Sequence, residues 1–178
     1  MFTNNYKYCV EGNWNCGASS LSVYPSQAII DTNGTSHSSS GSLYHSTSSQ
    51  ATYKQLANFA QSFFFKWSQS SNLTSTTSGN PSVNFCNKES LADTDYAVET
   101  AVGSSGISFV DGYLYATIAN NTSANITVNT LQLIITYTYS GNDYNFLMAE
   151  WDLGETTITP GNSKTYVIRQ EFDSAESV

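Results

Sequence analysis

The stretch that decides the fold is Leu131-Gln-Leu-Ile-Ile-Thr-Tyr-Thr-Tyr139. Its odd-numbered positions are all apolar or aromatic, and its even-numbered positions are polar except for Ile134. Because successive side chains of a strand point to opposite faces, this period of two predicts a half-buried β-strand. We expect the strand to begin near Ile126 and to end at the turn-forming residues 140–143.

Neighbouring segments carry the same signal. Residues 113–119, 146–153 and 164–172 are predicted strands, and Thr159-Pro-Gly-Asn162 fits a type II turn with glycine where a positive φ is needed. The connections are too short for crossover helices, so we expect antiparallel pairing. Such a sheet needs a second apolar layer, which predicts a mainly β fold: an antiparallel β-sandwich of immunoglobulin-like or jelly-roll-like type.

The first half of the chain is harder to interpret. The three-to-four spacing of apolar residues favours one short helix over residues 51–67, although the run at its end also suits a strand. Residues 68–82, which include Pro81, are predicted to be a loop. The polar tract 31–50 predicts either a mobile loop or an extended arm that becomes ordered against a partner.

These patterns divide the chain into two regions. Residues 1–80 are predicted to be an arm-like, loop-rich N-terminal region, with short strands around residues 21–24 and 28–30. Residues 81–178 are predicted to be the sandwich domain, and twelve of the fourteen acidic residues lie there.

Charge and hydropathy exclude several classes of function. The formal net charge is −8 with only six Lys and Arg residues, so we expect no nucleic-acid partner, because phosphate backbones are bound by clustered basic residues. No run approaches the roughly 18 apolar residues of a membrane span, so no membrane association is expected. The first residues lack the basic and apolar segments of a secretory signal, so we expect assembly in the cytoplasm.

Candidate catalytic groups are few. His37 and His45 lie in or beside the Ser-rich tract, which leaves a Ser/His hydrolase as one hypothesis, although no Gly-x-Ser-x-Gly motif is present. Glu150 and Asp152 would share one strand face, and alternation already explains them as a solvated face opposite the apolar one. We therefore predict no enzyme activity and no catalytic, cofactor-binding or metal-binding residues.

The cysteines do not form a recognisable site. Cys9 and Cys16 are seven residues apart, which is not a usual zinc-ligand spacing, and Cys86 lies far along the chain. A Cys9–Cys16 disulfide and free thiols both remain open, and the absence of an export signal favours free thiols.

Several short motifs occur in a suggestive order. They are Met1-Phe-Thr-Asn-Asn-Tyr-Lys7, Ser90-Leu-Ala-Asp-Thr-Asp-Tyr-Ala-Val-Glu99, Leu147-Met-Ala-Glu150 and Pro160-Gly-Asn-Ser-Lys-Thr165. In this order the chain resembles small structural β-sandwich proteins of tailed bacteriophages and prophages. The resemblance covers about residues 81–172 and the first seven residues; it departs at Val98, where leucine is expected.

The resemblance implies a non-enzymatic virion component, such as a minor capsid, decoration, collar or tail protein. Its expected partners are capsid, neck or tail subunits and copies of itself. The alternative is a receptor- or glycan-binding module that attaches to a host surface. We expect partner contacts in the N-terminal region, at Trp14, Tyr24, His37, Tyr44 and His45.

Overall fold

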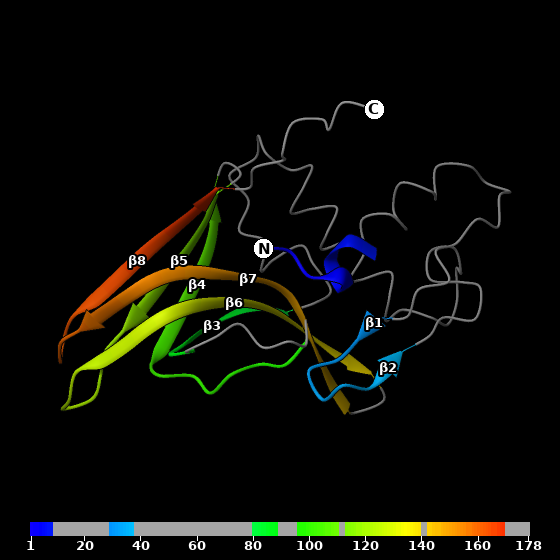
Figure 1. Ribbon diagram of the computed structural model, residues 1–178, viewed down its shortest axis with the longest axis horizontal. Helices are drawn as coiled ribbons and strands as arrows, with labels where there is room; N and C mark the ends of the chain where they lie inside the picture. Colours follow the sequence, from blue (N-terminus) through cyan, green and yellow to red (C-terminus); the bar gives the residue numbers. More distant parts are fainter. Residues whose placement is uncertain (9–28, 38–79, 89–95, 111–112, 140–141, 170–178) are drawn as a thin grey trace, which may run out of the picture.

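The computed structural model describes residues 1–8, 29–37, 80–88, 96–110, 113–139 and 142–169 (Figure 1). A helical turn begins at Asn4, and all paired strands are antiparallel. The strands are β1 (Ile29–Ile30), β2 (Ser36–His37), β3 (Asn80–Cys86), β4 (Ser104–Val110), β5 (Tyr113–Ala119), β6 (Ile126–Tyr139), β7 (Asn142–Ile158) and β8 (Ser163–Arg169). The predicted antiparallel β-sandwich is confirmed.

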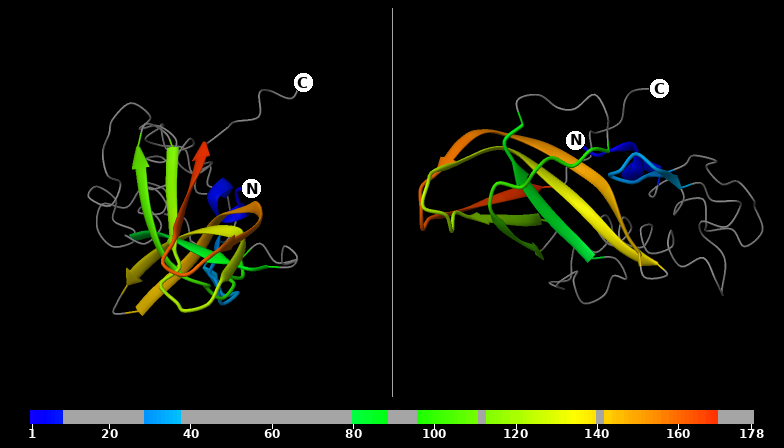
Figure 2. Two further views of the ribbon diagram at one scale, coloured as in Figure 1. Left: turned by 90° about the vertical axis from the view of Figure 1, so that its left-hand side faces the viewer. Right: turned by 90° about the horizontal axis from the view of Figure 1, so that it is seen from below.

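Two sheets of unequal length form the sandwich. The long sheet has the order β3-β6-β7, and the short sheet has the order β4-β5-β8. Strands β6 and β7 have 14 and 17 residues, whereas every strand of the short sheet has seven. Figure 2 shows the long strands curving past the end of the short sheet.

The tight connections follow from their turn residues. Tyr139 pairs with Asn142, so two residues join β6 to β7 in the predicted hairpin. The turn from β7 to β8 has the N–H of Asn162 bonded to the carbonyl of Thr159 at 3.2 Å, and Gly161 takes a φ of 76°. That value is in the left-handed region, which glycine enters without steric cost.

Three sequence-based boundaries need correction. The predicted loop 68–82 is wrong at its end, because β3 begins at Asn80 and Pro81 pairs with Ile135. The proline is tolerated because β3 is at the edge of its sheet order. Residues 31–37 are ordered as a turn and a strand, and the strand predicted at 146–153 is longer at both ends. The helix predicted over 51–67 and the short strand near residues 21–24 lie outside the described residues.

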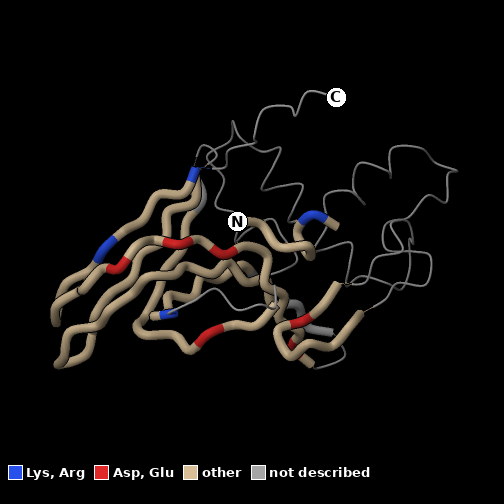
Figure 3. The backbone as a smooth tube through the Cα atoms, viewed as in Figure 1, with Lys and Arg blue, Asp and Glu red and all other residues tan. Residues whose placement is uncertain are grey.

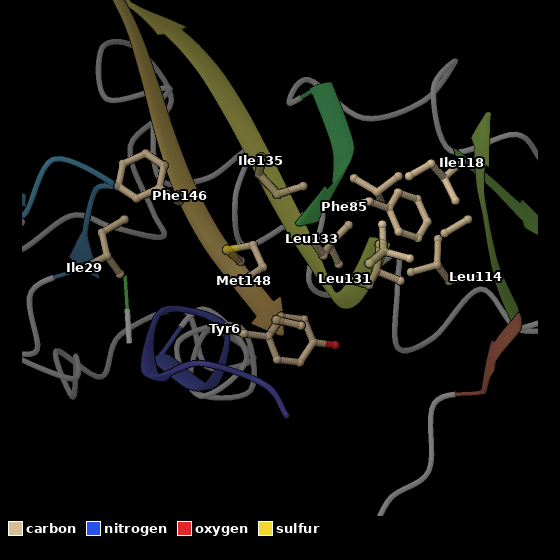
Figure 4. Packing of buried hydrophobic residues seen from close by; sticks show 14 of the residues in the cluster. Tyr6, Ile29, Phe85, Leu114, Ile118, Leu131, Leu133, Ile135, Phe146 and Met148 are labelled. Atoms are coloured by element: carbon tan, nitrogen blue, oxygen red, sulfur yellow. The ribbon is translucent and has the colours of Figure 1, made fainter. Parts of the chain in front are cut away.

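The hydrophobic core is continuous but has two parts (Figure 4). Between the sheets, Phe85 and Leu131 face Leu114 and Ile118, and the ring of Phe85 lies 5.7 Å from that of Tyr166. Beyond the short sheet, the core consists of side chains from the N-terminal segments and from β7. They are Tyr6, Ile29, Phe146 and Met148.

The second part of the core exists because two N-terminal segments cover β7. Residues 1–8 and 29–37, here called the clasp, lie along the half of β7 that the short sheet does not reach. Phe2 forms a bridge with Ala149, and the N–H of Thr32 donates to the carbonyl of Asn145 at 2.8 Å. The clasp thus extends the long sheet and closes its core.

The other face of the long sheet is not the solvated face that alternation predicts. Residues 131–135 are all buried, and Gln132, in the middle of β6, has no exposed surface. Residues 97–99 cross this face, where Gln132 donates to the carbonyl of Ala97 at 3.3 Å. The middle of β6, residues 131–135, is therefore buried on both faces.

Candidate functional site

The clasp holds β7 mainly through its backbone. The N–H of Thr3 donates to the carbonyl of Met148 at 3.0 Å, and the N–H of Glu150 donates to the carbonyl of Met1 at 2.9 Å. The amino group of Met1 also donates to the carbonyl of Glu150. These bonds add a short strand to the edge of β7, a mode of recognition that depends little on the side chains of the edge itself.

Side chains lock this short strand in register. The hydroxyl of Thr3 donates to the carbonyl of Leu147 at 2.8 Å. The ring of Phe2 stacks on Tyr6 at 4.1 Å and meets Trp151 edge-on at 5.9 Å. Because these rings pack against buried core, the clasp contributes apolar burial as well as hydrogen bonds.

Asn5 joins the two halves of the clasp. Its Nδ2 donates to the carbonyl of Ile30 at 2.7 Å, and its Oδ1 accepts from the N–H of Ile30 at 2.8 Å. An amide side chain that satisfies both backbone groups of one residue acts like a paired strand. Residues 1–8 and 29–37 therefore form one unit.

Asp31 shapes the hairpin between β1 and β2. Its Oδ1 accepts from the N–H groups of Asn33 and Thr35, both at 2.9 Å, and Gly34 takes a φ of 80° in the turn. Its Oδ2 lies 2.8 Å from Nε2 of His37. Burial opposes ionisation of this carboxyl, but the hydrogen bonds from His37, Thr35 and Asn33 outweigh it and lower the pKa of Asp31.

His37 is the one expected contact residue that the structure describes. Its ring meets Tyr144 edge-on at 5.2 Å and Phe146 at 5.5 Å, so it packs between Asp31 and β7. Among the described residues, Asp31 is its hydrogen-bond partner, and no serine hydroxyl bonds to it. Trp14, Tyr24, Tyr44 and His45 lie outside the described residues.

A second polar cluster lies on the opposite face of the long sheet. Nζ of Lys88 lies 3.0 and 2.9 Å from the two carboxylate oxygens of Glu150, and Nε2 of Gln132 donates to that carboxylate at 2.6 Å. Gln132 Oε1 accepts from Asn84 at 2.9 Å. The side chains of Lys88 and Glu150 are only 5% and 14% exposed.

This cluster corrects the interpretation of Glu150 and Asp152 as a shared solvated face. Asp152 is exposed, but the Glu150 side chain is largely buried and forms an ion pair with Lys88. Cys86 is buried, and burial together with the nearby Glu150 raises the pKa of its thiol to about 11, which disfavours the reactive thiolate. The charges of Lys88 and Glu150 pair with each other inside the cluster, so we infer that the cluster stabilises the fold and is not a binding site.

Sequence reasoning missed the clasp and the ion pair for different reasons. The ion pair had a signal, since a glutamine between Leu131 and Leu133 must find hydrogen-bond partners if the strand is central. The clasp had none, because Thr3 and Asn5 acquire their role only from carbonyls of β7 and β1 that are remote in sequence.

Other site types find little support in the described part of the chain. No group of three or more His, Cys, Asp or Glu residues there could hold a metal ion. In the same residues no helix is long and apolar enough to cross a bilayer. No family model, no curated protein and no solved structure matches this chain.

Proposed function

We propose that this chain is a non-enzymatic structural subunit of a bacteriophage particle and acts through protein–protein assembly. One observation carries the proposal: an edge of the long sheet is completed by an N-terminal extended segment through backbone hydrogen bonds. Strand addition of this kind joins protein chains in many assemblies and needs no chemistry beyond backbone pairing. We place this assembly in a bacteriophage particle because the sequence resembles phage structural proteins.

The placement of charge is consistent with this role. The described histidine and the buried lysine are both engaged in pairs inside the fold, with Asp31 and Glu150. The strands of the short sheet contain no acidic residue, whereas β7 carries the exposed acidic residues Asp143, Asp152 and Glu155 (Figure 3). Surfaces that differ in charge favour defined contacts between subunits over random association.

Light scattering coupled to size-exclusion chromatography tests the proposal on the full chain. A series from low to high micromolar concentration should give an oligomer of defined mass, and negative-stain images of that fraction should show one particle shape. A chain that stays monomeric across the whole series would contradict self-assembly.

A glycan-binding module is the second candidate, and the outer face of β5 favours it. The rings of Tyr113 and Tyr115 lie 6.4 Å apart on this face, and the 53% exposed Val167 is the neighbour of Tyr115 on β8. Tyr113 and Tyr115 are half-buried, and the accessible part of an aromatic ring can stack on the apolar face of a sugar. Binding on a glycan array that Tyr115→Ala abolishes, with unchanged thermal unfolding, would favour this candidate over the first.

A further inference from the structure

The long sheet cannot close its own core. The short sheet covers the part of the core at Phe85 and Leu131, and the clasp covers the part at Phe146 and Met148 (Figure 4). Phe146 and Met148 are 1% and 0% exposed, and they belong to the same core cluster as Tyr6 and Ile29 of the clasp. Without the clasp, a contiguous apolar patch beside an unpaired strand edge would face solvent, and such a surface recruits another chain.

The clasp is a self-contained unit. Its two segments are tied by the Asn5–Ile30 hydrogen bonds, and its turn is fixed by Asp31. Its described contacts with the sandwich fall on one stretch of β7, from Tyr144 to Trp151.

The sequence places this unit far from the strands it covers. Residues 38–79 separate β2 from β3, which is 42 residues. A chain of that length reaches up to about 140 Å when fully extended, several times the diameter of a domain this size. Covalent connection therefore does not require that a clasp cover the β7 of its own chain.

From these observations we infer that the clasp is exchanged between copies of this chain, so that residues 1–8 and 29–37 of one copy cover β7 of a neighbour. The inference rests on the assembly function proposed above and gives its contact. Exchange uses the same hydrogen bonds and ring contacts in a different pair of chains, so it adds no cost in the contacts themselves. When each copy donates one clasp and accepts one, every β7 edge is covered.

Disulfide trapping in the full chain tests the exchange. Phe2→Cys and Ala149→Cys are placed in separate, differently tagged chains, because these residues are bridge partners. Cys9 and Cys16 are replaced by serine, and Cys86 is kept because it is buried. The two chains are co-expressed and oxidised, and we expect a mixed disulfide of both tags on non-reducing gels.

A second cysteine pair keeps the exchange testable if the first variants do not fold. Thr32→Cys and Asn145→Cys replace half-buried polar residues at another clasp contact, where the backbone groups lie 2.8 Å apart. Lys7→Cys with Ala149→Cys is the matched control, since Lys7 belongs to the clasp but is exposed. A mixed disulfide in both facing pairs, at least tenfold above the control, supports exchange.

The outcomes separate this inference from the proposed function. If both cysteines are placed in one chain and only an internal disulfide forms, while light scattering still shows an oligomer, exchange is wrong and assembly stands. If the chain is monomeric and the disulfide is internal, both are wrong. A mixed disulfide no stronger than the Lys7 control also overturns exchange.

Discussion

Strand β7 has two halves that share one backbone and have different surroundings. Residues 144–151 are covered by the clasp, and Phe146 to Ala149 are buried without interruption. Residues 152–157 are mostly exposed, although they continue the same strand. The boundary is an irregularity in pairing, where Val128 faces Thr156 but Thr130 faces Asp152. The comparison shows that burial along this strand is set by what covers it, and less by its own alternation.

The largest expected loss of stability comes from removing a buried side chain from the half of β7 that the clasp covers. Phe146→Ala removes a fully buried ring from the part of the core that lies under the clasp, which should lower the free energy of unfolding by about 3–5 kcal/mol. Leu153→Ala is the control in the exposed half, where the side chain is only partly buried and a smaller loss is expected. Chemical denaturation measures both, and equal losses would contradict the difference between the halves.

The buried ion pair behind the covered half should give the next largest effect. Lys88→Met leaves the carboxylate of Glu150 without its cation, and breaking a buried pair on one side should cost about 3 kcal/mol. The double variant Lys88→Met/Glu150→Gln removes the stranded charge and keeps an acceptor for Gln132. It should therefore be more stable than the single variant, and a double variant that is less stable would contradict this account.

The strands of the sandwich were predictable because their signals are local. The alternation in 113–119 and 126–139 reproduces β5 and β6 at both ends, and the Pro160–Gly161 turn is where its chemistry requires it. The sequence did not predict which segments cover those strands. Whether Gln132 faces water depends on residues 97–99 and Lys88, which no local pattern connects to it.

The candidate site was less predictable for the same reason. The place of His37 in a Ser-rich tract predicts a partner contact or a base, and in the structure it is half-buried against Asp31 and Tyr144. The bridge between Phe2 and Ala149 joins residues 147 positions apart, and neither carries a signal for the other. Contacts of this range follow from the three-dimensional fold alone.

The clasp should loosen in acid before the sandwich does. The folded-state pKa of Asp31 lies below its ordinary value of 3.8, so its ionised form stabilises the fold above that pH. This stabilisation is lost as the pH falls through the lower folded pKa. Asp31→Asn should lose about 1–2 kcal/mol near neutral pH and lack this part of the acid dependence, because charged hydrogen bonds of the turn are weakened.

Hydrogen exchange between pH 5 and pH 2.5 locates the effect. The N–H groups of Thr3 and Thr32 report on the clasp, and the N–H groups of β5 report on the sandwich. Glu155→Gln, on the exposed half of β7, is the control outside the clasp, and it should leave the exchange of the Thr3 and Thr32 N–H groups unchanged. Equal loss of protection in clasp and sandwich would mean that the clasp does not open separately.

The smallest expected effect concerns the boundary between the halves. Gly154 takes a φ of 64° in the irregular stretch and has open space around it, so a side chain there meets no atom but must accept a left-handed backbone. Gly154→Ala should therefore cost about 1 kcal/mol through conformation alone. Gly106→Ala in β4 is the matched control, because it also points into open space and does not have a positive φ. Thermal unfolding of the two variants measures the stability cost of the left-handed backbone at residue 154. If Gly154→Ala is as stable as Gly106→Ala, the backbone conformation of Gly154 does not stabilise the boundary.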